Sequence, residues 1–110
     1  VSSNMDVALP DGTGDRDYLD VLRKAVPSAL NRFSPDIVFY NAGVDPHRDD
    51  RLGRLGLSDW GLEERDALVM DNVRSRGIAL AGVIGGGSAA DVDVLAARHA
   101  TLHRVAARFA

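Results

Sequence analysis

The sequence predicts an α/β fold in which helices flank a parallel sheet. Two short apolar segments, 36–42 and 78–84, have the length and composition of buried strands. Amphipathic helical segments precede, separate and follow them, and this alternation is typical of parallel sheets. A shorter apolar run, 5–9, is a weaker candidate for a third strand. Because strands that are apolar on both faces need neighbours on both sides, we expect part of a larger three-layer structure.

The helices are indicated by apolar residues at three- and four-residue spacing, which places them on one helical face. This pattern occurs in three segments: 15–33, 59–76 and 91–109. Pro27 predicts a kink or a restart within the first helix. Ser58 can cap the second helix, and Gly77 can supply the left-handed residue that often follows a helix end.

Composition argues against several classes of function. The chain has 110 residues with a formal net charge of −3 and no basic stripe, which gives little support for nucleic-acid binding. Cysteine is absent, so disulfide frameworks and thiolate metal sites are excluded. The longest apolar stretch, 78–90, is interrupted by glycines and too short to span a bilayer. With no signal-peptide pattern at the N-terminus, we expect a cytoplasmic protein that does not bind membranes.

Side chains suited to acid–base or metal chemistry follow the first predicted strand. Asp45, His47, Asp49 and Asp50 come shortly after it, and in parallel α/β sheets ligands bind beyond the carboxyl ends of the strands. Asp45 and His47 could supply two zinc ligands, but a catalytic zinc normally takes three from the protein. The alternative is that Asp45 caps the following turn and His47 is solvated.

Two other patterns have weaker functional interpretations. Gly85-x-Gly87-x-x-Ala90 loosely fits a dinucleotide fingerprint, but the acidic residue expected about 20 residues later is missing. Glycines at a helix start could still let backbone N–H groups approach a bound group. His99 and His103 have a chelating spacing but no acidic partner beside them, so we expect a packed, hydrogen-bonded pair.

Three blocks occur in a distinctive order: MDVALPDGTGDRDYLDVL, FSPDIVFYNAGVDPHRDDRLGRLGLSDWG and VIGGGSAADVDVLAARHATLHR. The first resembles an N-x-P-L-x-x-G-x-x-D-x-x-Y segment, and the second an F-x-P-D…G-x-D-x-H-x-x-D-x-L-G…L-x-x-x-G block. The third resembles a G-G-G-Y strand-to-helix turn. Together these blocks resemble the C-terminal part of the histone deacetylase and acetylpolyamine amidohydrolase family, which has the arginase–deacetylase fold.

The resemblance implies a role for each matching residue. Residues 1–110 would form the C-terminal part of the family's domain, without its N-terminal part. Asp45 matches the third zinc ligand, so His47 would not be the second. Leu52 matches a residue of the acyl-lysine channel, and Gly86, with Gly87 beside it, matches a glycine whose backbone faces the substrate.

The family's reaction is the hydrolysis of acetyl-lysine or an acetylpolyamine. Zinc polarises the amide carbonyl and activates a water, a histidine pair transfers protons, and a tyrosine hydroxyl stabilises the oxyanion. The other zinc ligands and the histidine pair belong to the family's N-terminal portion. Ser88 occupies the tyrosine position, where its shorter side chain cannot reach as far, and it is expected to cap a helix instead. The resemblance further implies that Asp50 and Gly53 shape the loop.

These implications lead to two functional readings. The chain is either a fragment of a zinc-dependent deacetylase that is inactive alone, or a non-catalytic binder of acylated amines with a decayed site. In either case we expect it to self-associate through an exposed sheet or core surface, because small soluble proteins rarely leave large apolar patches open.

Overall fold

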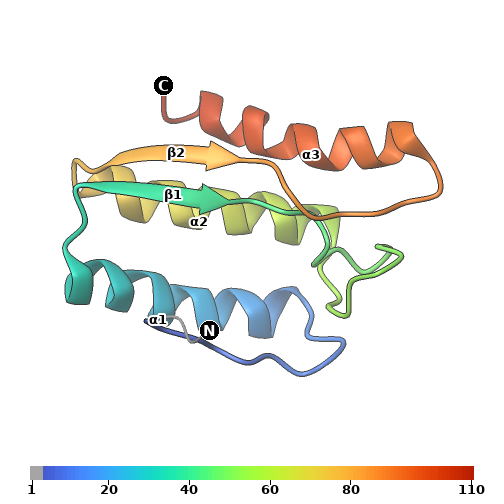
Figure 1. Ribbon diagram of the computed structural model, residues 1–110, viewed down its shortest axis with the longest axis horizontal. Helices are drawn as coiled ribbons and strands as arrows, with labels where there is room; N and C mark the ends of the chain where they lie inside the picture. Colours follow the sequence, from blue (N-terminus) through green and yellow to red (C-terminus); the bar gives the residue numbers. More distant parts are fainter. Residues whose placement is uncertain (1–3) are drawn as a thin grey trace.

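The computed structural model describes residues 4–110 and confirms the α/β class with a parallel sheet (Figure 1). Strands β1 and β2 pair in parallel from Ile37↔Ala79 to Asn41↔Val83. This pairing confirms that the two strongest predicted strands are neighbours joined through a helix. The elements in chain order are α1 (Asp15–Phe33), β1 (Ile37–Asn41), α2 (Asp59–Ser75), β2 (Ala79–Val83) and α3 (Val92–Ala107).

The helices pack on one face of the sheet. Val38 and Tyr40 of β1 point toward the helical core, where they meet Val73 of α2 or Leu102 of α3. In Figure 1, α2 lies behind the strands, with α1 on one side of it and α3 on the other. The opposite face is open within residues 4–110: Ile37 is 47% exposed and Phe39 76% exposed. The strands are therefore covered on one face only by the described part of the chain.

The prediction of a third strand at residues 5–9 is wrong. The described chain forms a two-stranded sheet, and the segment instead runs along α1 (Figure 1), with Val7 52% exposed. The run is short and ends at Pro10, which has no backbone N–H to donate to a ladder. Its end is instead tied to the long loop after β1, since the Gly12 N–H donates to the Arg54 carbonyl at 2.6 Å.

Helix α1 runs unbroken through Pro27, so the predicted restart is wrong. Proline removes the hydrogen bond to the carbonyl four residues earlier, which belongs to Arg23 on the exposed side of the helix. The helix ends where Ser34 adopts a left-handed conformation and donates its N–H to the Leu30 carbonyl at 3.0 Å. No helix within residues 4–110 has both the length and the apolar composition needed to cross a membrane.

The predicted cap of α2 is confirmed and also connects two helices. The Ser58 hydroxyl accepts a hydrogen bond from the Gly61 N–H at 3.1 Å. The same residue donates its N–H and its hydroxyl to the Asp15 carboxylate, at 2.8 and 2.5 Å. Gly77 follows the helix with φ +71°, as predicted. Ser58 thus fixes the start of α2 against the start of α1.

We predict that Ser58→Ala lowers the free energy of unfolding by about 1–2 kcal/mol, the usual cost of losing an N-cap. Urea denaturation followed by circular dichroism would measure the change. Ser75→Ala is the matched control, because the Ser75 hydroxyl donates to the Asn72 carbonyl at an exposed position near the other end of α2. Equal stability of the two variants would contradict a special role for Ser58.

Candidate functional site

The carboxyl ends of β1 and β2 bring two polar loops together. The first loop follows β1 over 42–57, and the second follows β2 over 84–91. Backbone bonds continue the strand pairing into them: Ala42 donates to the Val83 carbonyl at 2.9 Å, and Val44 to the Gly86 carbonyl at 3.1 Å. The loops emerge at the same edge of the sheet, where Figure 1 shows both strand arrows ending. This edge carries Asp45, as the sequence predicts.

The Asp45 carboxylate lies against the glycine backbone of both loops. A Cβ atom built at Gly43 or at Gly86 would lie 2.9 Å from Asp45 Oδ1. Gly86 also has φ +52°, a conformation that disfavours side chains. A larger residue at Gly86 would therefore strain the turn and collide with the carboxylate. The backbone of Gly43 and Gly86 thus packs against one side of the Asp45 carboxylate, while the residue as a whole is exposed.

Asp50 is the buried clamp between the loops. Its Oδ1 accepts the Ser88 N–H at 2.5 Å, and its Oδ2 accepts the N–H groups of Leu52 at 3.0 Å and Gly53 at 2.8 Å. Burial alone would raise the pKa of Asp50, but these three backbone donors, together with the charge of Arg98, hold the pKa below its usual 3.8. Asp50 thus shapes the loop as an ionised acceptor of backbone hydrogen bonds.

Leu52, predicted to line the substrate channel, and Ser88, predicted at the catalytic tyrosine position, both donate backbone N–H groups to Asp50. Leu52 projects from the first loop and is 81% exposed. The Ser88 carbonyl accepts the Arg51 N–H at 3.0 Å, which adds a second hydrogen bond between the two loops besides that from Ser88 N–H to Asp50. The prediction that Ser88 caps a helix is wrong. Asp91 caps α3 by accepting the N–H groups of residues 93 and 94, so the helix starts later than the glycine run suggests.

His47 is a buried structural histidine. It is 3% exposed, so the expectation that it is solvated is wrong. Its Nδ1 accepts the Asp49 N–H at 3.0 Å, and its Nε2 lies 2.8 Å from Asp59 Oδ1. Since Nδ1 acts as an acceptor, a neutral ring carries its proton on Nε2 and donates it to Asp59. Both ring nitrogens are therefore used to hold the loop against the start of α2.

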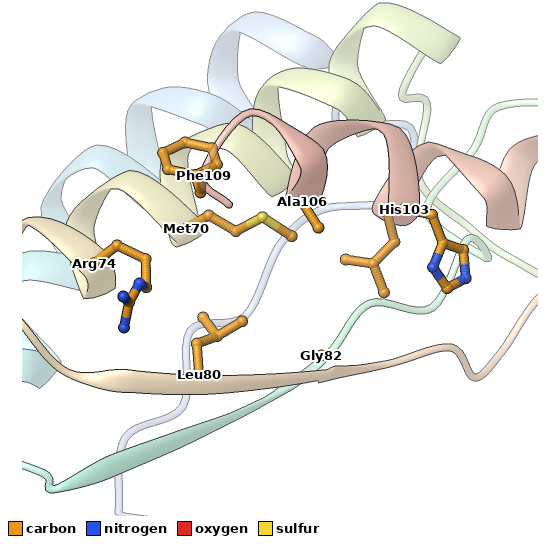
Figure 2. Close-up of a pocket in the computed structure, with 8 residues that line it drawn as sticks. Met70, Arg74, Leu80, Gly82, His103, Ala106 and Phe109 are labelled. Atoms are coloured by element: carbon orange, nitrogen blue, oxygen red, sulfur yellow. The ribbon is translucent and has the colours of Figure 1, made fainter.

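The histidines of α3 do not form a pair with a shared partner. His99 Nε2 lies 3.4 Å from the position of a Cβ atom at Gly87, and its buried Nδ1 has no hydrogen-bond partner. The expected hydrogen bonding is thus wrong for that atom. His103 instead lines an apolar hollow with Met70 of α2 and Leu80 of β2 (Figure 2). Within residues 4–110, no group of three or more potential ligands could hold a metal ion.

A network of buried polar side chains lies beneath the Asp45 loop, and the sequence analysis missed it. Arg65 donates its Nη1 to the Gly43 carbonyl at 2.6 Å and its Nε to Asp66 Oδ1 at 3.0 Å. The Tyr40 hydroxyl also donates to Asp66. A signal was present in the sequence, since residues 63–66 are four consecutive charges. They span roughly 300° of a helix, so they cannot all face solvent.

We predict that Asp50→Asn destabilises the fold near pH 7 by about 1.5–3 kcal/mol, the usual value of hydrogen bonds to a charged group. Because the folded pKa is lowered, the Asp50 contribution is complete above the unfolded pKa and is lost as pH falls through the folded value. The difference from the original protein should therefore shrink below about pH 4. Urea unfolding across this pH range tests it, with exposed Asp71→Asn as control. A difference that stays constant with pH would contradict the prediction.

Comparisons with known proteins agree with this arrangement. Residues 1–103 match the family model of the histone deacetylase domain. An uncharacterized protein from Picosynechococcus is 43% identical over 104 residues, covering 94% of this chain and 35% of that protein. Histone deacetylase 2 of Arabidopsis thaliana is 37% identical over 81 residues, covering 74% of this chain and 21% of that protein.

The likeness extends to three-dimensional structure. The crystal structure of the HDA15 HD domain superposes with a TM-score of 0.69 at 27% identity, over 87% of this chain and 26% of that one. The chain therefore spans between about a fifth and a third of the length of these three proteins. By sequence and by fold, the chain belongs to the histone deacetylase domain family.

Proposed function

We propose that this chain contributes one metal ligand and part of the substrate channel to a zinc-dependent deacetylase site. The observation that carries the proposal is the position of the Asp45 carboxylate. It is exposed at the edge where both loops meet, with glycine backbone behind it on both sides. An anionic oxygen donor held in this way suits a divalent metal ion.

The residues at this edge fit one zinc ligand and not a complete site. Asp45 would bind the metal, and the other protein ligands would come from polypeptide that this chain does not contain, since a catalytic zinc usually has three. When bound, zinc polarises the amide carbonyl and lowers the pKa of a water. The chain's own part is to orient that ligand, to line the channel with Leu52, and to present the backbone of Gly86 and Gly87 to the acyl group.

The substrate class we propose is an acetylated amine, either acetyl-lysine or an acetylpolyamine. Isolated, the chain should not hydrolyse it, because it supplies one ligand and lacks the histidine pair that handles protons. Ser88 adds a second deficit, since the family has tyrosine at this position. Serine here also supports the alternative function, a module that binds acylated amines without cleaving them.

The test uses a completed domain, in which residues 1–110 are joined to the part of the Picosynechococcus protein that they do not match. We predict zinc-dependent release of acetate from acetyl-lysine peptides or acetylpolyamines by this protein, and its loss in Asp45→Ala. Ser88→Tyr should raise turnover by about 100- to 1000-fold, the usual effect of one oxyanion donor. The same change in the isolated chain should do nothing.

Each result has a clear interpretation. Turnover that survives Asp45→Ala, or zinc-dependent turnover by the isolated chain, would contradict the proposed role of Asp45. A folded completed domain that binds acetyl-lysine but cleaves it neither with Ser88 nor with tyrosine would favour the binding module.

We further propose that the isolated chain self-associates through the open face of its sheet, with a second copy as the occupant. This face includes Ile37, Phe39 and Val83, and none of its residues is charged. Two copies related by a twofold axis could therefore cover it without burying a charge.

We predict that light scattering across a concentration series detects dimers or larger species, and that Phe39→Asp shifts them to monomer. Phe33→Asp is the control, because Phe33 is an exposed aromatic residue at the end of α1. The completed domain should stay monomeric if its added part covers the same face. A clean monomer of the original chain at all concentrations would overturn the proposal.

A further inference from the structure

A buried arginine lies directly beneath the strand end that leads to Asp45. Arg65 is only 4% exposed, and its guanidinium donates Nη1 to the Gly43 carbonyl and Nε to Asp66. The 2.6 Å bond joins Arg65 to the carbonyl of Gly43, two residues before Asp45. A buried charge needs compensation, and Asp66 supplies it.

Three elements hold the guanidinium in place. Arg65 belongs to α2, and its guanidinium carbon lies 5.8 Å from the ring centroid of Tyr40 in β1. Tyr40 also donates its hydroxyl to Asp66, which fixes the carboxylate that binds Arg65. Tyr18 of α1 is close enough for Arg65 to lower the pKa of its phenol, although burial raises that pKa overall. The rigid planar fork of arginine suits such a site, whereas lysine has a single charged nitrogen.

The bond to Gly43 is transmitted to the carboxylate through two residues of backbone. The Gly43 carbonyl and the Val44 N–H belong to the same planar peptide unit. Arg65 holds one side of this unit, and the Gly86 carbonyl accepts the Val44 N–H at 3.1 Å on the other. Asp45 follows immediately, with its Oδ1 packed against Gly43 and Gly86. This peptide is therefore held on both sides just before Asp45, at the point where the chain leads into the carboxylate.

We propose that Arg65 is the positioning residue for the Asp45 carboxylate, acting through the peptide between Gly43 and Val44. As far as metal binding is concerned, the inference rests on the proposed function. Groups that orient metal ligands typically change metal affinity by 10- to 100-fold when removed. Arg65 would be such a group, contacting neither metal nor substrate.

The first experiment needs no metal and uses the 110-residue chain. The variant is Arg65→Met with Asp66→Asn, which removes the cation without leaving a buried carboxylate unpaired. We expect the Val44 amide to lose at least about tenfold more hydrogen-exchange protection than the Ala42 amide, whose bond to the Val83 carbonyl belongs to the sheet. Equal changes at the two amides would show a purely structural role and overturn the proposal.

Arg74→Met is the matched control for this experiment. Arg74 lies on the same helix and donates its Nη1 to the Ile78 carbonyl at 2.9 Å, but at an exposed position on the far side from the site. Its removal should leave the Val44 and Ala42 amides unchanged relative to each other. If the double variant does not fold, Arg65→Lys takes its place, with the same comparison of amides and the same criterion.

The second experiment measures zinc affinity in the completed domain by competition with a fluorescent chelator. Asp45→Ala should abolish tight binding, and the double variant should weaken it by about 10- to 100-fold. If Asp45→Ala weakens binding and the folded double variant does not, this inference fails while the proposed function stands. If Asp45→Ala itself leaves affinity unchanged, the proposed function fails, and this inference fails with it as far as the metal is concerned.

Discussion

Because β1 and β2 run parallel, the chain has to return along α2 between them, and both strands then release their loops at the same edge of the sheet. That topology brings Asp45 next to Gly86, although 41 positions separate them in the sequence. Backbone bonds from Ala42 and Val44 extend the pairing beyond the strands proper. The candidate site therefore continues the sheet, and the pairing of β1 with β2 fixes how the two loops lie relative to each other.

Two buried charged side chains fix the conformation of these loops by hydrogen bonding to their backbone. Asp50 is an anion surrounded by backbone donors from both loops, and Arg65 is a cation that binds a backbone carbonyl of the first. Each has its compensation in place: three N–H groups for Asp50, and the Asp66 carboxylate for Arg65. For the buried Arg65–Asp66 ion pair, removing one partner typically costs about 3–5 kcal/mol, whereas replacing both by apolar residues of similar volume is often neutral. These groups consequently contribute less to net stability than to the choice of one loop conformation.

The sequence predicted the regular elements well because their signals are local. Apolar periodicity, the Ser58 cap and Gly77 located the helices and both strands to within about two residues, the usual uncertainty of such boundaries. Two of the failures, at residues 5–9 and at His47, involve contacts between distant residues, whereas the restart at Pro27 and the cap at Ser88 were wrong readings of local signals. The run at 5–9 has the composition of a strand, but within residues 4–110 it pairs with no other strand, and the ring of buried His47 lies against Asp59 at the distant start of α2. Tertiary partners of this kind cannot be read from spacing.

The site was predicted in part for the same reason. The resemblance to the deacetylase family singled out Asp45, Asp50 and Gly86, and the structure brings these three residues together, while their proposed roles in metal and substrate binding stay predictions. The sequence analysis did not predict the role of Arg65 because an arginine on a charged helix normally faces solvent. Its inward direction follows from the neighbouring Tyr40 and from Asp66, which is 1% exposed.

The two faces of the sheet differ in how they are packed. One face of β1 and β2 is packed against three helices, and this packing is sufficient to orient the loops that carry Asp45. The other face leaves Phe39 exposed, and at the strand ends Asp45 is the one metal ligand that we propose, whereas a metal site needs several donors. In the proposed site, the orientation of Asp45 would thus depend on contacts inside the chain, whereas metal affinity would depend on further ligands from other polypeptide.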